Sequence, residues 1–221
     1  MSYLLRVLLP DTPGSLGKLA NALGAIDGNI QSVDVIQANP DGTAMDDIVV
    51  DLPTSVLPDS LITAAVGVPG VAVDSIRPFS GSVDRRGQIK LLASLTGCSE
   101  QKAMEELVNL LPRTMTSGWA IALRVGAEAT RIAASPAAPE DNGHNPAIKI
   151  EAARKLDPET EAWIPSSWAL LDAALAAAPI GDSDVVIIAG RPGGPDFLAS
   201  EVEHLGDLAT IVGAMMKRPR G

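Results

Sequence analysis

The chain has 221 residues, of which 46% are hydrophobic and only 3% aromatic, and its formal net charge is −10. The apolar fraction is enough for a folded core built from aliphatic side chains. The negative charge and the scarcity of aromatic rings argue against nucleic acid and anionic membrane as partners, because those partners bind basic surfaces and stacking rings.

Few residues of the types that hold metals are present. Cys98 is the single cysteine, and His144 and His204 are the two histidines. A disulfide within one chain is therefore impossible, and a metal site built from thiolates and imidazoles lacks ligands. No leader pattern opens the sequence, and no apolar run approaches the roughly 18 residues of a membrane-spanning helix. We expect a soluble, cytoplasmic protein without metal or cofactor, which ends in a solvated basic tail at 217–221.

The first 79 residues predict the element order β-α-β-β-α-β. Apolar residues at helical spacing between 16 and 26 mark the first helix, and Gly28 is the expected left-handed residue after it. The order is typical of a ferredoxin-like fold, in which two helices cover one face of an antiparallel sheet. The predicted segments are strands at 3–9, 29–37, 43–52 and 71–77, and helices over 16–26 and from 58 onward.

A turn of Asp11, Thr12, Pro13 and Gly14 joins the first strand to the first helix. A helix N-terminus offers unpaired backbone N–H groups to a carboxylate, and Gly14 lets a ligand approach the backbone. Asp11 and the side chain of Asn29 are suited to an ammonium group. The pattern thus predicts a site for a zwitterion. The alternative is purely structural: Asp11 begins a turn, Pro13 starts the helix and Asn29 caps a strand.

The element order, together with "LLPDTPGSLGKLANALGAIDGNIQSVDV" and "VGVPGVAVDSIRP", resembles an ACT domain over Tyr3 to Pro78. The resemblance implies that the turn and the start of the next strand bind a free amino acid at a dimer interface, and so regulate an attached or partner enzyme. Leu9 stands where serine-sensing members have a polar residue. The ligand-binding residues that the resemblance implies are Asp11, Thr12, Pro13, Gly14, Ser15, Leu16, Asn29 and Ile30.

A small, polar segment at 80–87 is the predicted linker to a second domain at 88–216. There "AALAAAPIGDSDVVIIAGRPGGPDFLASEVEHLGDLATIV" resembles the C-terminal half of a GAF domain, a sensor or dimerisation module. The resemblance implies an antiparallel sheet framed by helices and assigns no ligand residues. The predicted segments are helices at 88–95, from 99 onward and at 197–216, and strands at 119–125, 129–134, 173–179 and 185–189.

The stretch 135–168 is rich in Pro, Asn, Asp and Gly and shows no plain core pattern, which is typical of a binding lid or a variable insertion. Helix-start signals stand at 145–146 and 157–158. Further along, Ser200 and Glu203 have the spacing of a capping box for the last helix.

Catalytic candidates are sparse. Glu201 and His204 lie one helical turn apart, but no second such pair exists, which favours a solvated face over a metal site. Asp46 and Asp47 are adjacent in a strand, so they point to opposite faces and do not form a carboxylate pair. The turn at 191–195 is suited either to an anion or to a tight strand-to-helix connection.

Together these features predict a two-domain α+β protein without catalytic activity, which senses a free amino acid and transmits the signal through a homodimer or a partner. Two alternatives stay open. One is an enzyme that uses acidic and basic residues of 135–168, and the other is a structural adaptor.

Overall fold

The computed structural model describes residues 1–79, 86–141, 143 and 147–216. The chain divides into two compact units, Met1–Val83 and Asp84–Gly221. Residues 80–85 of the expected linker and the basic tail lie outside the described residues, whereas the last two linker positions already belong to helix α3, which begins at Arg86. Within the described ranges, no helix has both the length and the apolarity needed to cross a bilayer.

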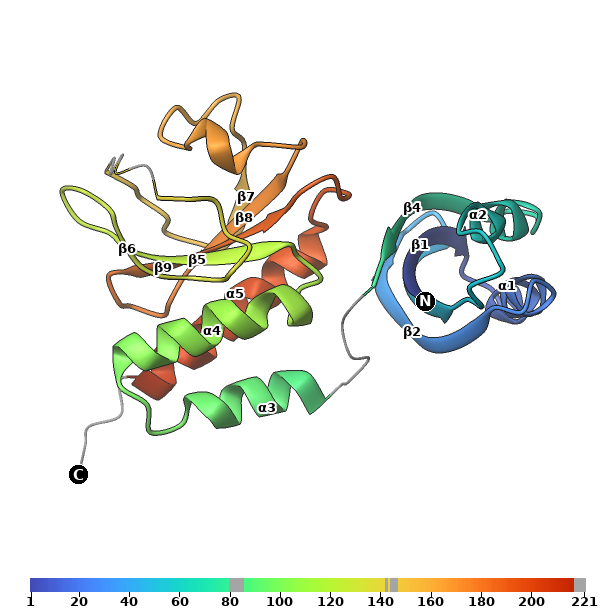
Figure 1. Ribbon diagram of the computed structural model, residues 1–221, viewed down its shortest axis with the longest axis horizontal. Coiled ribbons are helices and arrows are strands. Elements are labelled where there is room, and N and C mark those ends of the chain that lie inside the picture. Colours follow the sequence, from blue (N-terminus) through green and yellow to red (C-terminus); the bar gives the residue numbers. More distant parts are fainter. Residues whose placement is uncertain (80–85, 142, 144–146, 217–221) are drawn as a thin grey trace. The chain divides into compact units, whose positions relative to one another are not determined.

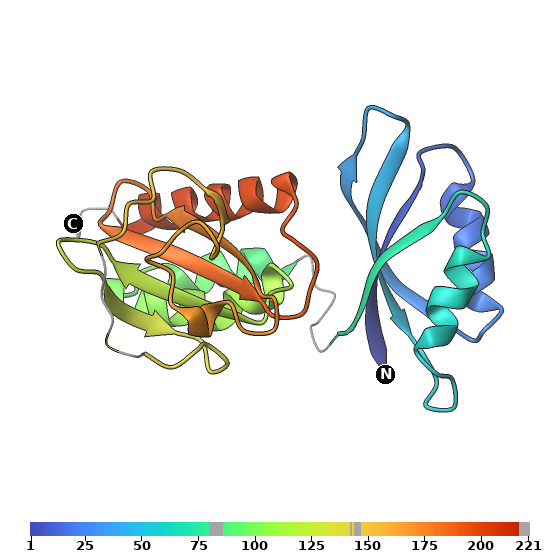
Figure 2. The same cartoon turned by 90° about the horizontal axis from the view of Figure 1, so that it is seen from above.

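The first unit has the element order that the sequence predicts. Its four strands form one antiparallel sheet in the order β2-β3-β1-β4, and α1 and α2 lie together on one side of it (Figure 1 and Figure 2). The elements are β1 (Ser2–Pro10), α1 (Ser15–Gly24), β2 (Asn29–Ala38), β3 (Thr43–Asp51), α2 (Asp59–Val66) and β4 (Ala72–Pro78).

The two central strands build the core of this unit. Leu5 of β1 lies opposite Ile48 of β3, and because successive side chains alternate, Leu9 and Val50 face the same way. These residues pack with Leu19, Leu23, Leu61 and Ala65 of the two helices. The period-2 pattern of the strands and the period-3.6 pattern of the helices therefore meet in one apolar layer.

A buried ion pair occupies the opposite face of the same strands. Arg6 of β1 lies directly opposite Asp47 of β3. The Arg6 guanidinium donates from Nε to Asp47 Oδ1 at 2.7 Å and from Nη2 to Oδ2 at 2.8 Å. Both residues are buried. As predicted, Asp46 and Asp47 point to different faces of the sheet. Asp46 lies opposite Val7 and Asp47 opposite Arg6, and Val7 and Arg6 are neighbours on β1 whose side chains alternate.

The end of α1 differs from the prediction for Gly28. Asp27, with φ 59°, has the left-handed backbone, and Gly28 is not among the residues with positive φ. Gly28 instead lies at a close approach. A Cβ placed there would come within 2.8 Å of the carbonyl oxygen of Leu23 and 3.1 Å of Val50 Cγ1. Lack of space, and not backbone conformation, requires glycine at this position.

The second unit is also a mixture of helices and an antiparallel sheet, with strand order β6-β5-β9-β8-β7. Helices α3, α4 and α5 lie on one side of this sheet (Figure 1). Its elements are α3 (Arg86–Leu95), α4 (Glu100–Thr114), β5 (Trp119–Arg124), β6 (Thr130–Ala134), β7 (Arg154–Leu156), the 3-10 helix η1 (Ser166–Trp168), β8 (Ala174–Pro179), β9 (Val185–Arg191) and α5 (Ala199–Met216).

The stretch 135–168, which shows no plain core pattern in the sequence, nevertheless contributes to the core. Residues of this stretch cover the other face of the sheet, and Ile148, Ile150, Leu156, Ile164 and Trp168 are buried there against Trp119 and Ile188. Strand β7 adds an edge to the sheet, and no helix begins at Asp157-Pro158. The other helix-start signal, at 145–146, lies outside the described residues.

Side chains cap the starts of two helices in this unit. Helix α4 begins after Ser99, whose Oγ accepts a hydrogen bond from the backbone N–H of Lys102. The capping box of Ser200 and Glu203 is wrong. Ser200 lies inside α5, and its buried Oγ has no hydrogen-bond partner among the described residues. The start of α5 is instead capped by Glu201, whose Oε2 accepts from the backbone N–H of Leu198 at 2.8 Å.

Candidate functional site

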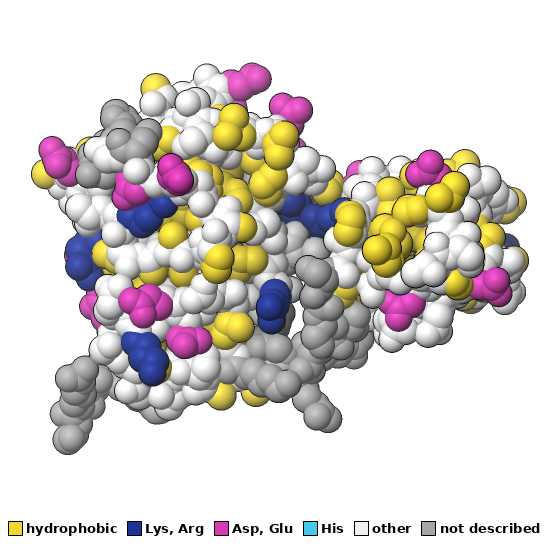
Figure 3. Space-filling view, in the orientation of Figure 1, with side chains coloured by type: hydrophobic (Ala, Val, Ile, Leu, Met, Phe, Trp, Pro, Cys, Tyr) yellow, Lys and Arg dark blue, Asp and Glu magenta, His cyan; other side chains and the backbone are white. Residues whose placement is uncertain are grey.

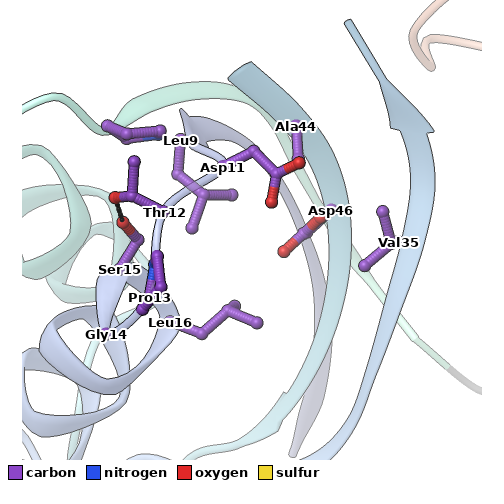
Figure 4. Close-up of a pocket in the computed structure, with 11 residues that line it drawn as sticks. Leu9, Asp11, Thr12, Pro13, Gly14, Ser15, Leu16, Val35, Ala44 and Asp46 are labelled. Carbon is purple, nitrogen blue, oxygen red and sulfur yellow. Dashed lines mark hydrogen bonds between the residues drawn. The ribbon is translucent and has the colours of Figure 1, made fainter. Parts of the chain in front are cut away.

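The first unit contains a cavity of about 360 Å³ between the β1–α1 turn and strands β2 and β3 (Figure 4). Its lining combines a helix N-terminus, two carboxylates and several aliphatic side chains. The lining residues are Leu9, Pro10, Asp11, Thr12, Pro13, Gly14, Ser15, Leu16, Val35, Ala44 and Asp46.

The β1–α1 turn is held by short local hydrogen bonds. The backbone N–H of Thr12 donates to the carbonyl of Pro10 at 2.9 Å, and that of Ser15 to the carbonyl of Thr12 at 3.1 Å. The hydroxyls of Thr12 and Ser15 bond to each other at 2.8 Å. Gly14, the residue before α1, has φ 91°, which favours glycine. A Cβ placed on Gly14 would find no atom within 4 Å, so its backbone faces open space.

The N-terminus of α1 leaves donors available at the cavity. No side chain caps this helix. Among the described residues, the backbone N–H groups of Gly14 and Leu16 have no hydrogen-bond partner. Both residues line the cavity. Free N–H groups and the partial positive charge of a helix N-terminus together favour an anionic group at this position.

Asp46 places a carboxylate in the apolar layer beneath the turn. It lies opposite Val7 of β1 and Val35 of β2, in the row of side chains that continues with Ile48. Its residue surface is 1% exposed. Its Oδ1 has no hydrogen-bond partner among the described residues. Burial raises the pKa of the Asp46 carboxyl, and the charges of Asp11 and Asp47 raise this pKa further.

Asp11 brings a second carboxylate to the cavity. Its backbone N–H donates to the carbonyl of Gly42 at 2.8 Å, which anchors the end of β1 to the β2–β3 turn. Figure 4 shows the carboxylates of Asp11 and Asp46 directed toward the same space. An ammonium group placed between them would offset their mutual repulsion and the desolvation of Asp46.

Six of the eight predicted site residues, Asp11 to Leu16, line this cavity. Asn29 and Ile30 do not. Asn29 is paired with Asp51 at one end of β3, whereas the cavity residue Ala44 is near the other end. The seven residue steps from Ala44 to Asp51 span about 23 Å of extended strand. Within one copy of the chain, Asn29 therefore cannot share a ligand with the turn.

The residue that the sequence reasoning missed is Asp46. The adjacency of Asp46 and Asp47 correctly excluded a carboxylate pair. Asp46, which faces the core, is nevertheless a candidate ligand-binding residue by itself. The sequence signal was the alternation of side chains along a strand. Asp46 lies two and four positions before Ile48 and Val50, so it shares the core face with them.

The candidates in the second unit have structural partners. The Arg191 guanidinium, at the start of the 191–195 turn, donates to Glu201 Oε1 at 2.7 Å and to the carbonyl of Met115 at 3.0 Å, and lies 4.1 Å from the ring centroid of Phe197. These contacts explain the turn as a connection between β9 and α5. Among the described residues, no three acidic, histidine or cysteine side chains are grouped to hold a metal ion.

Comparison with known proteins does not assign the chain to a family. No protein-family model matches it, and no curated protein matches it. Among solved structures, the GAF domain of the Acinetobacter phosphoenolpyruvate-protein phosphotransferase is 13% identical, with a TM-score of 0.48 over 59% of this chain and 90% of that one. The A. aeolicus nlh2 GAF domain is 15% identical, with a TM-score of 0.40 over 59% of this chain and 93% of that one.

A formyltetrahydrofolate deformylase from Pseudomonas putida KT2440 is 10% identical, with a TM-score of 0.30 over 42% of this chain and 37% of that one. Because these TM-scores lie below 0.5, the likenesses assign neither a family nor an activity to the chain.

Proposed function

We propose that the chain is a non-catalytic regulatory protein whose first unit is an ACT domain of ferredoxin-like fold that binds a free amino acid. The observation that carries this proposal is the cavity itself. Unpaired N–H groups of α1 line one part of it, and Asp46, a buried carboxylate with an unpartnered oxygen, lines another. An α-amino acid has a carboxylate and an ammonium joined through one carbon, which matches this pairing of opposite polarities.

In the proposed site, backbone groups bind one end of the ligand and side chains bind the other. The N–H groups of Gly14 and Leu16 hold the carboxylate of the ligand, where the α1 dipole adds to their attraction. Asp11 and Asp46 hold the ammonium. This assignment keeps Asp11 in the role that the sequence predicts and replaces Asn29 by Asp46 within a single copy.

A homodimer restores a role for Asn29 and Ile30. The ACT resemblance implies a ligand at an interface between copies, and these residues reach a cavity only from a second copy. We therefore propose a side-by-side dimer of the first unit. Light scattering of the full chain at micromolar concentration tests it, and a monomer both with and without amino acids would contradict it.

The second unit has the antiparallel sheet with helices that the GAF resemblance implies. We propose that it is a GAF-like sensor or dimerisation unit that passes the ligand state of the first unit to a regulated partner, for which an enzyme is the leading candidate. Turnover of a metabolite panel by the purified chain would favour the alternative of an enzyme, and assembly without any ligand response would favour the alternative of an adaptor.

The direct test is isothermal titration calorimetry of the full chain with each proteinogenic amino acid. In a thermal scan, a ligand at 100 times its Kd should add about 2.7 kcal/mol to the free energy of unfolding. Gly14→Val should abolish binding, because its side chain would occupy the open space over the turn. Gly97→Val is the matched control, since Gly97 also has positive φ and open space around its Cβ position but belongs to the second unit. Binding to none of the amino acids, or unchanged binding by Gly14→Val, would refute the proposal.

A further inference from the structure

The charges in the cavity are all of one sign. Of its eleven lining residues, all of them described, Asp11 and Asp46 are acidic and none is basic. An acidic ligand side chain would therefore meet two carboxylates and no cation. Like charges brought together in a partly desolvated site repel strongly, so the lining disfavours aspartate and glutamate as ligands.

The two carboxylates provide one position for a cation. They are directed toward the same space in Figure 4, Asp46 from the buried row of β3 and Asp11 from the exposed turn that follows β1. One ammonium between them satisfies both. The second ammonium of a diamino acid would find no further acidic side chain among the lining residues. The cavity thus matches a ligand with a single positive charge.

The other walls of the cavity are apolar. Leu9 and Ala44 are buried, and Leu16 and Val35 are exposed. The hydroxyls of Thr12 and Ser15, which are the neutral polar side chains of the lining, already bond to each other. A ligand hydroxyl would have to break that bond to gain a partner, whereas a ligand methyl group contacts Leu9, Leu16 or Val35 without such a cost.

We propose that the cavity selects an amino acid with an uncharged aliphatic side chain, whose ammonium lies between Asp11 and Asp46. This inference rests on the proposed function and narrows it to one ligand class. A cavity of about 360 Å³ is at the small end of ligand sites in proteins, which suits a single aliphatic amino acid.

The test is calorimetric titration of the full chain with L-valine, L-leucine and L-isoleucine, and with L-serine, L-lysine and L-aspartate. At least one aliphatic amino acid should bind ten times more tightly than serine, lysine and aspartate. The 2-hydroxy acid counterpart of that ligand, which lacks the ammonium, should bind at least a hundred times more weakly.

The variant Asp46→Asn tests whether Asp46 contacts the ammonium group of the ligand. This variant should lower the affinity for the aliphatic amino acid at least a hundredfold and reduce its advantage over the 2-hydroxy acid to less than tenfold. A purely structural role for Asp46 would change both affinities together and leave their ratio unaltered. Asp74→Asn is the matched control, because Asp74 is an exposed residue of β4 outside the cavity lining, and it should preserve both affinities.

Three results overturn the inference. Tighter binding of serine, lysine or aspartate would refute the aliphatic class but leave amino-acid binding established. An unchanged ligand ratio in Asp46→Asn would refute the role of Asp46 in holding the ammonium. Binding to none of the six amino acids by the unmodified chain would refute this inference, and failure of all the others as well would refute the proposed function.

Discussion

Replacing Asp46 by Asn should stabilise the first unit in the absence of ligand. Asp46 is 1% exposed, its carboxylate lies in a row of aliphatic side chains, and its Oδ1 has no partner among the described residues. Asn has nearly the same shape and no charge. The change therefore removes the desolvation of an ion and its repulsion by Asp11 and Asp47, at the cost of a buried amide that itself needs partners.

Burying an unpaired polar group costs about 1–3 kcal/mol when it is neutral and more when it is charged, so the gain is the excess cost of the charge, on the order of 1 kcal/mol. For a unit of 83 residues, Met1–Val83, each kcal/mol corresponds to a rise of roughly 4–8 °C in melting temperature. The sign depends on pH. Because the fold raises the pKa of Asp46 above its usual value of 3.8, this residue favours folding below that pH. Its contribution is lost as the pH rises through the folded pKa, so the advantage of Asp46→Asn should grow from acid to neutral pH and then level off.

Differential scanning calorimetry of the full chain from acid to neutral pH measures this difference. Asp74→Asn serves again as control, and its stability should follow that of the unmodified chain. An Asp46→Asn variant that is less stable at neutral pH would refute the reasoning, because it would show that the carboxylate has a stabilising partner. A stability gain that is constant over the whole pH range would exclude the raised pKa as its cause.

Three further predictions concern other parts of the chain. Arg6→Met should destabilise the first unit by about 3–5 kcal/mol in urea denaturation, since it leaves the buried carboxylate of Asp47 without its guanidinium partner, and the additional change Asp47→Leu should recover much of the loss. The Arg154 guanidinium lowers the pKa of Glu161 to about 2, so Glu161 stabilises the fold above its usual pKa of 4.5. This contribution disappears as the pH falls toward 2, and the deficit of Glu161→Gln in thermal scans should shrink over that interval; a constant deficit would contradict it. Brief trypsin digestion should cut first within 80–87, as mass spectrometry of the fragments would show, and earlier cleavage inside β1 would contradict independent units.

The fold of the first unit was predictable because its signals are local. The apolar runs of β1 and β3 each mark a strand, and the helical stripe of α1 specifies both a helix and the face that it buries. The turn was equally visible, since Pro13 and Gly14 determine its backbone. Asp46 was not recognised because its meaning depends on register: only the pairing of β3 with β1 and β2 shows that this carboxylate lies beneath the turn.

The buried residues of 135–168 could not be predicted for a different reason. Ile148, Ile150 and Ile164 reach the core from irregular backbone and Trp168 from the short helix η1, so no repeating period identifies them. The cap of α5 was misplaced because Ser200 and Glu203 have the capping-box spacing, whereas Glu201 follows Leu198, which has no capping side chain. The partner of Glu201 determines the cap, since Arg191 holds its carboxylate at the helix start.

The tryptophans all lie in one of the two units, so their intrinsic fluorescence reports on that unit alone. All three tryptophans belong to the second unit, where Trp168 packs edge-on against both Trp119 and Trp163, and the single tyrosine, Tyr3, is in the first. Light absorbed by indole alone is therefore emitted from a cluster outside the unit that holds the cavity. An amino acid that enters the cavity changes this emission only when its effect crosses from one unit to the other. The fluorescence of the unlabelled chain thus measures communication between the units, separately from binding.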